Sequence, residues 1–268
     1  MQKLSRQETR QRLKKLGIAA PSRSSFGLRD ATRKTRYDWH SHPHHQLLYA
    51  FRGTVRLESA ESEFVLPPQR AAWIPAGVIH ATTVENFDCG SIFLEPATVA
   101  NAGDRVRVIS ASPLLREMVR TACRWPAAHS ASDPLANSFF ETVTLFCQEW
   151  IEQELPFYLP RPKSRMIKCA ADYILANLDS ASFTDTAQHV HASERTLRRH
   201  FEEDLGISWS KYLHQARMLR AIELLAKSES TVTETAYSIG FRSLSAFSKA
   251  YREFTGELPG DRKRKTDA

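Results

Sequence analysis

The chain has 268 residues, of which 42% are hydrophobic and 25% charged, a composition typical of a folded protein with room for two domains. It contains no apolar run near the roughly 18 residues that a membrane span needs, and no apolar export signal opens it. We therefore expect a cytoplasmic protein rather than a membrane or disordered one, while the net charge of +7 admits nucleic acid as a partner.

The excess positive charge is concentrated in a basic N-terminal tail, residues 1–29, which holds eight basic residues and one acidic residue. Residues 30–163 hold 13 basic and 15 acidic residues, and residues 164–268 hold 16 and 14. Such a tail is either a DNA-contacting arm or a solvated disordered leader, and we expect the leader. The case for DNA must therefore come from individual residues.

Residues 37–95 alternate short apolar runs with turn signals. The runs are HQLLYAF, TVRLESA, FVL, AAWIPAG and CGSIFLE, and RG and PPQ stand among the turns. This spacing predicts a small antiparallel β sandwich or barrel. The stretch WHSHPHHQLLYAF, which opens the region, places four histidines within six positions: His40, His42, His44 and His45.

Two helices are expected after Pro113. The first carries Leu114, Leu115, Met118, Val119 and Cys123 at helical spacing, and the second carries Phe139, Val143, Phe146 and Trp150. The second stripe is large for a small sheet domain to cover alone, so we expect a homodimer through this helix and its partner near 115–119. The alternative is that the stripe packs on its own sheet.

The segment PFYLPRPKS, residues 156–164, is expected to be an interdomain linker because of its three prolines in seven residues. The four cysteines form no CxxC pair for zinc or redox chemistry, and we expect all of them to be buried thiols: Cys89, Cys123, Cys147 and Cys169.

The rest of the chain is predicted to be helical, and it repeats itself. Residues 184–206 align with residues 231–256, and each copy holds a short helix, a turn, a longer helix and a final glycine suited to a helix C-terminus. This is the pattern of a helix-turn-helix unit. WSKYLHQARMLRAIELLAKS predicts a long amphipathic helix between the copies, which would present two recognition helices to successive major-groove turns about 34 Å apart.

The repeat resembles the DNA-binding region of the AraC/XylS family of transcription regulators. The resemblance covers most of residues 165–262 and is carried by Ala187, Arg195, Leu197, Arg199 and Phe201, then Arg217, Ala221, Leu224 and Leu225, then Ala236, Gly240, Phe241, Phe247, Ser248, Tyr251 and Gly256. The chain departs from the family pattern at its end, where LPGDRKR replaces the usual close.

The resemblance implies which residues face DNA. In the first helix-turn-helix unit these are Arg195, Arg198 and Arg199, and in the second Arg242, Ser245, Ser248 and Lys249. An arginine fork matches the O6 and N7 atoms of guanine, so we expect Arg198 above all to read a base; phosphate contact is the alternative. The serines of the second unit carry less information, which predicts a more degenerate second half-site.

The N-terminal region is similar to cupin domains. The similarity covers roughly residues 30–97 and rests on H-S-H-x3-Q-x6-G, starting at His40, and on P-A-G-x2-H, ending at His80. It implies that His40, His42, Gln46 and His80 form a metal or effector site, although Gln46 stands where cupins usually have a carboxylate ligand. A cupin domain ahead of such a DNA-binding region is a common arrangement in the family.

Strand alternation would point His40, His42 and His44 to one face, with His45 pointing away and His44 nearer the rim. Two interpretations of this cluster stay open. The imidazoles hold a divalent transition metal of unknown identity, or they act as hydrogen-bond donors to a small polar effector.

Together these features predict an α+β protein of two domains: a cupin-like antiparallel β barrel with dimerisation helices, and an all-α double helix-turn-helix. The expected division is 1–29 tail, 30–97 sensor, 98–155 dimerisation helices, 156–164 linker and 165–262 DNA-binding domain. The expected function is effector-responsive regulation of promoter DNA without enzymatic activity, with RNA polymerase as a candidate contact. The alternative is a metal-dependent cupin enzyme that carries a DNA-binding tail.

Overall fold

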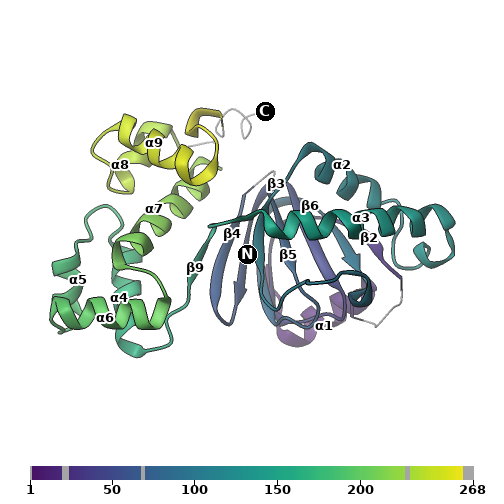
Figure 1. Cartoon of the computed structure of the whole chain (residues 1–268), viewed down its shortest axis with the longest axis horizontal. Helices are drawn as coiled ribbons and strands as arrows, with labels where there is room; N and C mark the ends of the chain where they lie inside the picture. Colours follow the sequence, from purple (N-terminus) through teal and green to yellow (C-terminus); the bar gives the residue numbers. More distant parts are fainter. Residues whose placement is uncertain (1, 20–23, 68–69, 227–229, 262–268) are drawn as a thin grey trace. The chain divides into compact units, whose positions relative to one another are not determined.

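The computed structural model describes residues 2–19, 24–67, 70–226 and 230–261 (Figure 1). The chain forms two compact units. The first unit comprises residues 1–60 and 64–155, and the second comprises residues 61–63 and 156–268. None of the described helices has the length and apolar character needed to cross a membrane.

The first unit is built on a curved sheet with helices against it (Figure 1). Its strands are β1 Gln2–Lys3, β2 Phe26–His40, β3 His45–Ser59, most of β4 Ser62–Leu66, β5 Arg70–Ile74, β6 His80–Leu94, β7 Arg107–Ser110 and β8 Glu154–Leu155. Its α-helices are α1 Arg6–Lys15, α2 Pro113–Ala122 and α3 Pro134–Glu152, and single 3-10 turns span Pro96–Thr98 and Ser130–Ser132.

The order of strands in the sheet is β1-β2-β6-β3-β5-β7-β8, and β4 also pairs with β3. Every strand pair along this path is antiparallel except β1 with β2. The predicted sheet-rich domain is thus confirmed, but the turn expected at Arg52–Gly53 is wrong. Gly53, with φ at +79°, lies instead inside the long strand β3, where the register with β6 shifts on both sides of Arg52. A β-bulge bends the strand without ending it.

Helices α2 and α3 cover one face of this sheet, where they close a hydrophobic core cluster. Leu115 and Val119 of α2 and Val143 and Trp150 of α3 are buried there, and Phe139 and Phe146 pack partly buried against the cluster. The expectation that the α3 stripe is too large for its own domain is therefore wrong. The side chains left exposed are other leucines: Leu114 at 47%, Leu135 at 59% and Leu145 at 75%.

The N-terminal tail is folded over its described residues 2–19, which corrects the expected disordered leader. Helix α1 starts with a capping box in which Ser5 and Glu8 satisfy each other's backbone N–H groups. Leu13 and Ile18 then pack on Phe26 and Phe93 of the sheet. Apolar anchors spaced along a basic segment thus decide its structure, whereas net charge alone suggested a solvated one. Strand β2 likewise starts earlier than the sequence indicated.

The second unit contains six α-helices among its described residues: α4 Arg165–Ala176, α5 Phe183–His189, α6 Glu194–Leu205, α7 Trp209–Leu225, α8 Val232–Ser238 and α9 Leu244–Thr255. Each begins at a Ser or Thr whose side chain accepts a backbone N–H of the first turn: Ser164, Ser182, Ser193, Ser208, Thr231 and Ser243. The helix ends at Gly206 and Gly256 are left-handed, with φ at +68° and +78°, as the repeat predicted.

The segment expected as a linker belongs to the second unit, where it contains the short strand β9, Tyr158–Pro160. Phe157 is fully buried and stacks on Phe254 with ring centroids 5.3 Å apart. The backbone N–H groups of Lys163 and Ser164 both donate to the Asp204 carboxylate at 2.9 Å. The Phe157 ring and these two hydrogen bonds therefore hold the segment against the helices.

The four cysteines differ in environment. Cys89 and Cys147 are buried, Cys123 is half-buried and Cys169 is exposed. The expectation of four buried thiols is therefore wrong for Cys169, which lies on the outer side of α4, and only partly met for Cys123.

Candidate functional site

The predicted imidazole cluster assembles inside the first unit. The ring centroids of His40 and His80 are 4.3 Å apart, and those of His42 and His80 are 5.2 Å apart. His42 and His80 are 4% and 1% exposed, and His40 is half-buried. Three of the histidines that the sequence singled out thus converge on one interior site.

Strong bending of β6 makes this convergence possible. His80 begins β6 and Phe93 lies near its other end, yet the His42 ring is 5.2 Å from the first ring and 5.5 Å from the second. A straight strand of this length would separate them by about 40 Å. The sheet therefore curls until both ends of β6 meet the turn that carries His42.

The ring nitrogens of the three histidines are arranged alike. Each Nδ1 lies within hydrogen-bond distance of a backbone carbonyl: His40 with Asp38 at 2.7 Å, His42 with His44 at 2.7 Å, and His80 with Val78 at 3.0 Å. A carbonyl only accepts, so each Nδ1 carries the proton and donates. In the neutral ring the lone pair then lies on Nε2, which makes the cluster a set of hydrogen-bond acceptors rather than the donors expected from the sequence.

Gln46 completes the site from β3. Its amide oxygen lies 3.0 Å from Nε2 of His42, and its amide nitrogen lies 2.9 Å from the Ser91 hydroxyl. With the His42 proton on Nδ1, the opposite orientation of the amide satisfies both partners: the amide NH2 donates to His42, and the Ser91 hydroxyl donates to the amide oxygen. Gln46 thereby holds His42 in one orientation.

Burial keeps these rings neutral. It lowers the pKa of His42 to about 4, despite the hydrogen bond from its ring to the His44 carbonyl. Burial also lowers the pKa of His80 well below its ordinary value and lowers that of His40. Each positive ring would in addition repel its neighbours, so the uncharged state is favoured across the cluster.

The arrangement does not match a metal centre as it stands. Over the described part of the chain, no three His, Cys, Asp or Glu side chains are grouped so that they could hold a metal ion. The ring centroids of His40 and His42 lie 6.4 Å apart, and Gln46 occupies Nε2 of His42. The nitrogen donors suit a transition metal, but that of His42 is already engaged by Gln46.

The other two histidines depart from strand alternation, because β2 ends at His40 and β3 begins only at His45. His44 is fully buried with its ring edge-on to Phe26 at 5.3 Å, so its expected place near the rim is wrong. His45 does point away from the cluster: it stacks on Trp73, and its Nδ1 accepts the N–H of Ala76 at 2.9 Å. Ser91, Phe26 and Phe93 line the site, and only the strand pairing brings them there.

In the second unit, the arginines predicted on the first recognition helix are all exposed. Leu197, Phe201 and Leu205 mark the buried face of α6. With about 100° between successive residues, Arg195 and Arg199 stand far from that face, and Arg198 lies on its flank. The Arg198 guanidinium is 5.5 Å from the centre of the Phe183 ring, a cation–π contact that orients it. Arg199 is 3.8 Å from Glu203.

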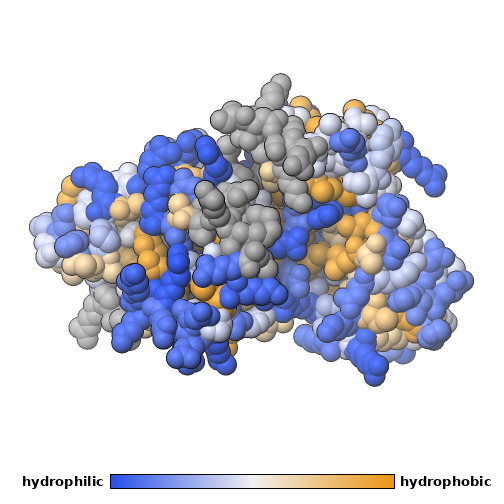
Figure 2. Space-filling model, turned by 180° about the vertical axis from the view of Figure 1, so that it is seen from behind, coloured by the Kyte–Doolittle hydropathy of each residue, from blue (hydrophilic) through white to orange (hydrophobic). Residues whose placement is uncertain are grey.

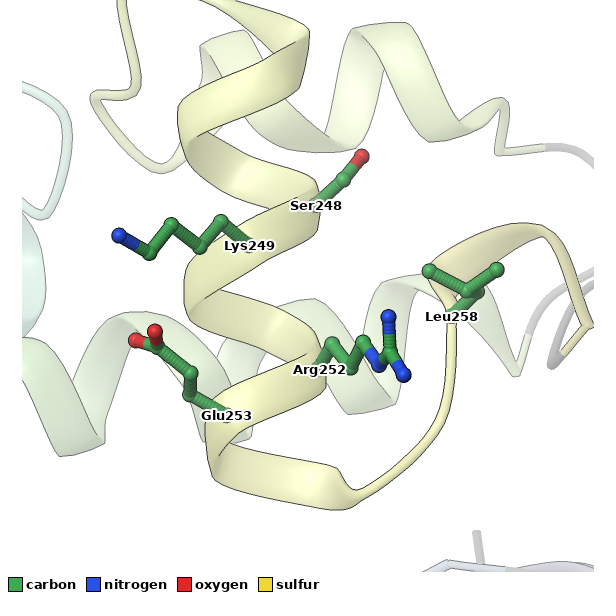
Figure 3. A pocket seen from close by; sticks show the side chains of 5 residues that line it. All are labelled: Ser248, Lys249, Arg252, Glu253 and Leu258. Atoms are coloured by element: carbon green, nitrogen blue, oxygen red, sulfur yellow. The ribbon is translucent and has the colours of Figure 1, made fainter.

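The second recognition helix, α9, lines a pocket of about 510 Å3 with two of its predicted residues (Figure 3). Ser248 and Lys249 line this pocket together with Arg252, Glu253 and Leu258, while Arg242 and Ser245 are exposed at the start of the helix. Arg252 was missed from the sequence. It follows Ser248 by four residues, which places it on the same helix face and adds a cation to it.

Comparison with known proteins agrees with this division. Residues 24–143 match the family described as AraC-like ligand binding domain, and residues 186–265 match a helix-turn-helix domain family. The HTH-type transcriptional regulator NimR of Escherichia coli (strain K12) is 26% identical over 223 residues, covering 82% of this chain and 80% of that protein. The transcriptional activator RhrA of Rhizobium meliloti (strain 1021) is 26% identical over 227 residues, covering 78% and 68%.

Among solved structures, a transcriptional regulator from Chromobacterium violaceum with an AraC-type DNA-binding domain is 29% identical. The matched region covers 38% of this chain and 91% of the solved chain, with a TM-score of 0.36.

Proposed function

Since the chain is a DNA-binding transcriptional regulator of the AraC family with an AraC-like ligand-binding domain, we propose that an effector bound at the imidazole cluster controls how the second unit binds promoter DNA. The observation that carries this proposal is the largely buried set of His40, His42 and His80, in which Nε2 of His40 and of His80 is left to accept while Nε2 of His42 meets Gln46. Buried polar groups that converge in this way are typical of ligand sites.

The chemistry of the cluster indicates the class of effector. Neutral rings that accept at Nε2 suit a molecule with hydroxyl or N–H donors. Gln46 adds an amide, and the stacked pair Phe26 and Phe93, with centroids 4.8 Å apart, offers an apolar wall beside His42. The proposed effector is therefore a small uncharged molecule with both a donor group and an apolar part.

A divalent transition metal is the second candidate occupant. Histidines that bind metals usually donate their other ring N–H to a carbonyl or carboxylate, and all three rings of the cluster do so. Coordination would require His42 to part from Gln46 and move toward His40. Because Gln46 supplies no anionic ligand, the metal would be held weakly, as an ion that is sensed rather than permanently bound.

On DNA, we assign the first half-site to Arg195, Arg198 and Arg199. We assign the second half-site to α9 and the turn before it. The residues that would contact it are Arg242, Ser245, Ser248 and Lys249, together with Arg252. The arginines of α6 have the geometry for guanine, whereas serine hydroxyls accept several bases. Reading of the second half-site is accordingly the more degenerate.

We place a homodimer interface at the exposed leucines of α2 and α3, Leu114, Leu135 and Leu145. The protein would act in the cytoplasm, contact RNA polymerase from the promoter and catalyse no reaction. The alternative, a metal-dependent cupin enzyme with a DNA-binding tail, is disfavoured by Gln46, which replaces the carboxylate of a catalytic centre. Turnover of any candidate effector by the purified protein would reverse this preference.

The test is a double variant, His40→Ala with His42→Ala, compared with wild type purified without a histidine tag. Metal content is measured first, and then the affinity for a promoter fragment recovered by the full chain, with and without panels of metal salts and small polar compounds. His129→Ala, an exposed histidine of the first unit, is the control.

We expect the double variant to lose the response while it still binds DNA. Loss of the response in a protein that never held metal supports the organic effector, and joint loss of metal and response supports the metal. A double variant that keeps the full response would exclude the cluster as the sensor.

A further inference from the structure

We propose that helix α1 is a second DNA-binding surface, which holds the phosphate backbone through a basic stripe, Arg6, Arg10 and Lys14. This surface is separate from the two helix-turn-helix units and lies on the first unit. It would bind duplex DNA without regard to sequence.

The fold turns the stripe outward by holding the other side of the helix. Thr9 and Leu13 are buried, and the Thr9 hydroxyl accepts the backbone N–H of Asp38 at 3.0 Å. Arg12, on the buried side, lies 3.5 Å from Asp30 and stacks over Tyr37. This arginine is thus part of the packing, and the stripe residues, one helical turn apart, remain exposed.

No acidic side chain in the described part of the chain pairs with the stripe. Within the described residues, none of Arg6, Arg10 and Lys14 forms an ion pair. Glu8 is the only acidic residue of the helix, and its carboxylate is bound to Ser5 in the capping box. Seen from behind, the edge of the first unit where α1 lies is mostly hydrophilic (Figure 2).

Charge complementarity selects DNA as the occupant. Residues four apart on a helix rise by about 6 Å, so the stripe presents a row of three cations about 12 Å long. A duplex carries a phosphate on each strand for every roughly 3.4 Å of its axis, so such a row can face several phosphates. Since the second unit already binds the same duplex, any contact from α1 gains from a high local concentration of DNA.

The experiment compares two triple variants of the full chain that remove the same charge. The stripe variant is Arg6→Gln, Arg10→Gln and Lys14→Gln. The control variant is Arg116→Gln, Arg120→Gln and Arg124→Gln, which also lies on the first unit, and whose Arg116 and Arg120 pair with Glu117. Affinity for a random-sequence duplex of about 40 base pairs is measured between about 50 and 200 mM salt.

We expect the stripe variant to bind more weakly. The slope of log affinity against log salt, which is negative, should become shallower by about 2 to 3, because each lost phosphate contact removes about 0.9 from its magnitude. The control variant should keep the wild-type slope to within about 1. Equal unfolding midpoints for the three proteins would show that the folds are intact. An unchanged slope in the stripe variant, or equal changes in both variants, would overturn the proposal.

Discussion

The guanidinium of Arg217 donates through Nε–H to the backbone carbonyl of Leu178 at 2.8 Å. Arg217 lies on α7, between the two helix-turn-helix units, and Leu178 follows α4 just before the first of them. Gly240 lies in the turn of the second helix-turn-helix unit, and a Cβ added there would lie 2.6 Å from Nη2 of the same arginine. One side chain thus sets the first helix-turn-helix unit against the second.

Replacing Arg217 should loosen this junction. Arg217→Gln leaves the Leu178 carbonyl without its charged donor, and we expect the free energy of unfolding to fall by about 1.5 to 3 kcal/mol. Affinity for a fragment with both half-sites should fall more than affinity for the first half-site alone. Urea unfolding and fluorescence anisotropy measure the two effects. Arg220→Gln, an exposed change on the same helix, should stay within about 0.5 kcal/mol of wild type, and equal losses would contradict the prediction.

Two left-handed glycines of the second unit should respond differently to alanine. Gly206 has φ at +68° and open space around a new Cβ, so Gly206→Ala should cost only the backbone strain of about 1 to 2 kcal/mol. At Gly240, with φ at +85°, the new Cβ would lie 2.4 Å from the Asp179 carbonyl oxygen, and backbone must move. Gly240→Ala should therefore be clearly more destabilising in urea unfolding. Similar losses of unfolding free energy for both variants would contradict this prediction and mean that the backbone around Gly240 can move at little cost.

Arg198 should discriminate at one base pair. We expect Arg198→Ala to lose about 1 to 3 kcal/mol of specific binding and to relax selectivity at a single position, as loss of a bidentate contact does. Phe183→Leu, which removes the ring beneath the guanidinium, should give a weaker loss at the same position. Binding to a set of single-base operator variants measures both. Uniform weakening on every sequence with a shallower salt slope would make Arg198 a phosphate contact.

The proposed dimer should depend on Leu145, which at 75% is the most exposed large apolar side chain among the described residues. Leu145→Glu places a charge in the proposed interface, so we expect sedimentation at micromolar concentration to shift from dimer to monomer. Leu175→Glu is the control, since this leucine is 42% exposed on α4 of the other unit. A wild-type protein that sediments as a monomer with and without DNA would refute the dimer.

Local patterns were sufficient for the helical half of the protein. Apolar spacing, serine and threonine caps and the final glycines specify short helices through contacts within a few residues, which is why the two helix-turn-helix units followed from the repeat. The α3 stripe was recognised for the same reason. Its partner was not, because whether an apolar face meets its own sheet or a second copy depends on elements far along the chain.

The imidazole cluster shows the same difference between local patterns, which could be predicted, and long-range contacts, which could not. The motifs around His40 and His80 pointed to an interior site, because the residue types and spacing are local features of the sequence. Strand alternation then misplaced His44, since residues 41–44 are not a strand, and the direction of hydrogen bonding depended on carbonyls of Asp38, His44 and Val78 that only the folded backbone places. The β3 bulge at Gly53 could not be predicted from the sequence either, because glycine is equally suited to a bulge and to a turn.

Motifs, composition and periodicity were enough to predict the class of protein and its two domains, and they led to the residues that we propose for DNA and for an effector. Tertiary structure alone decided that α1 is folded with a basic stripe outward, that Arg217 joins the two DNA-reading units, and that His42 is buried between both ends of β6. The physical reason is range. Helix caps and periodic faces act over a few residues, whereas burial, charge neutrality and strand curvature arise from contacts between segments far apart in the chain.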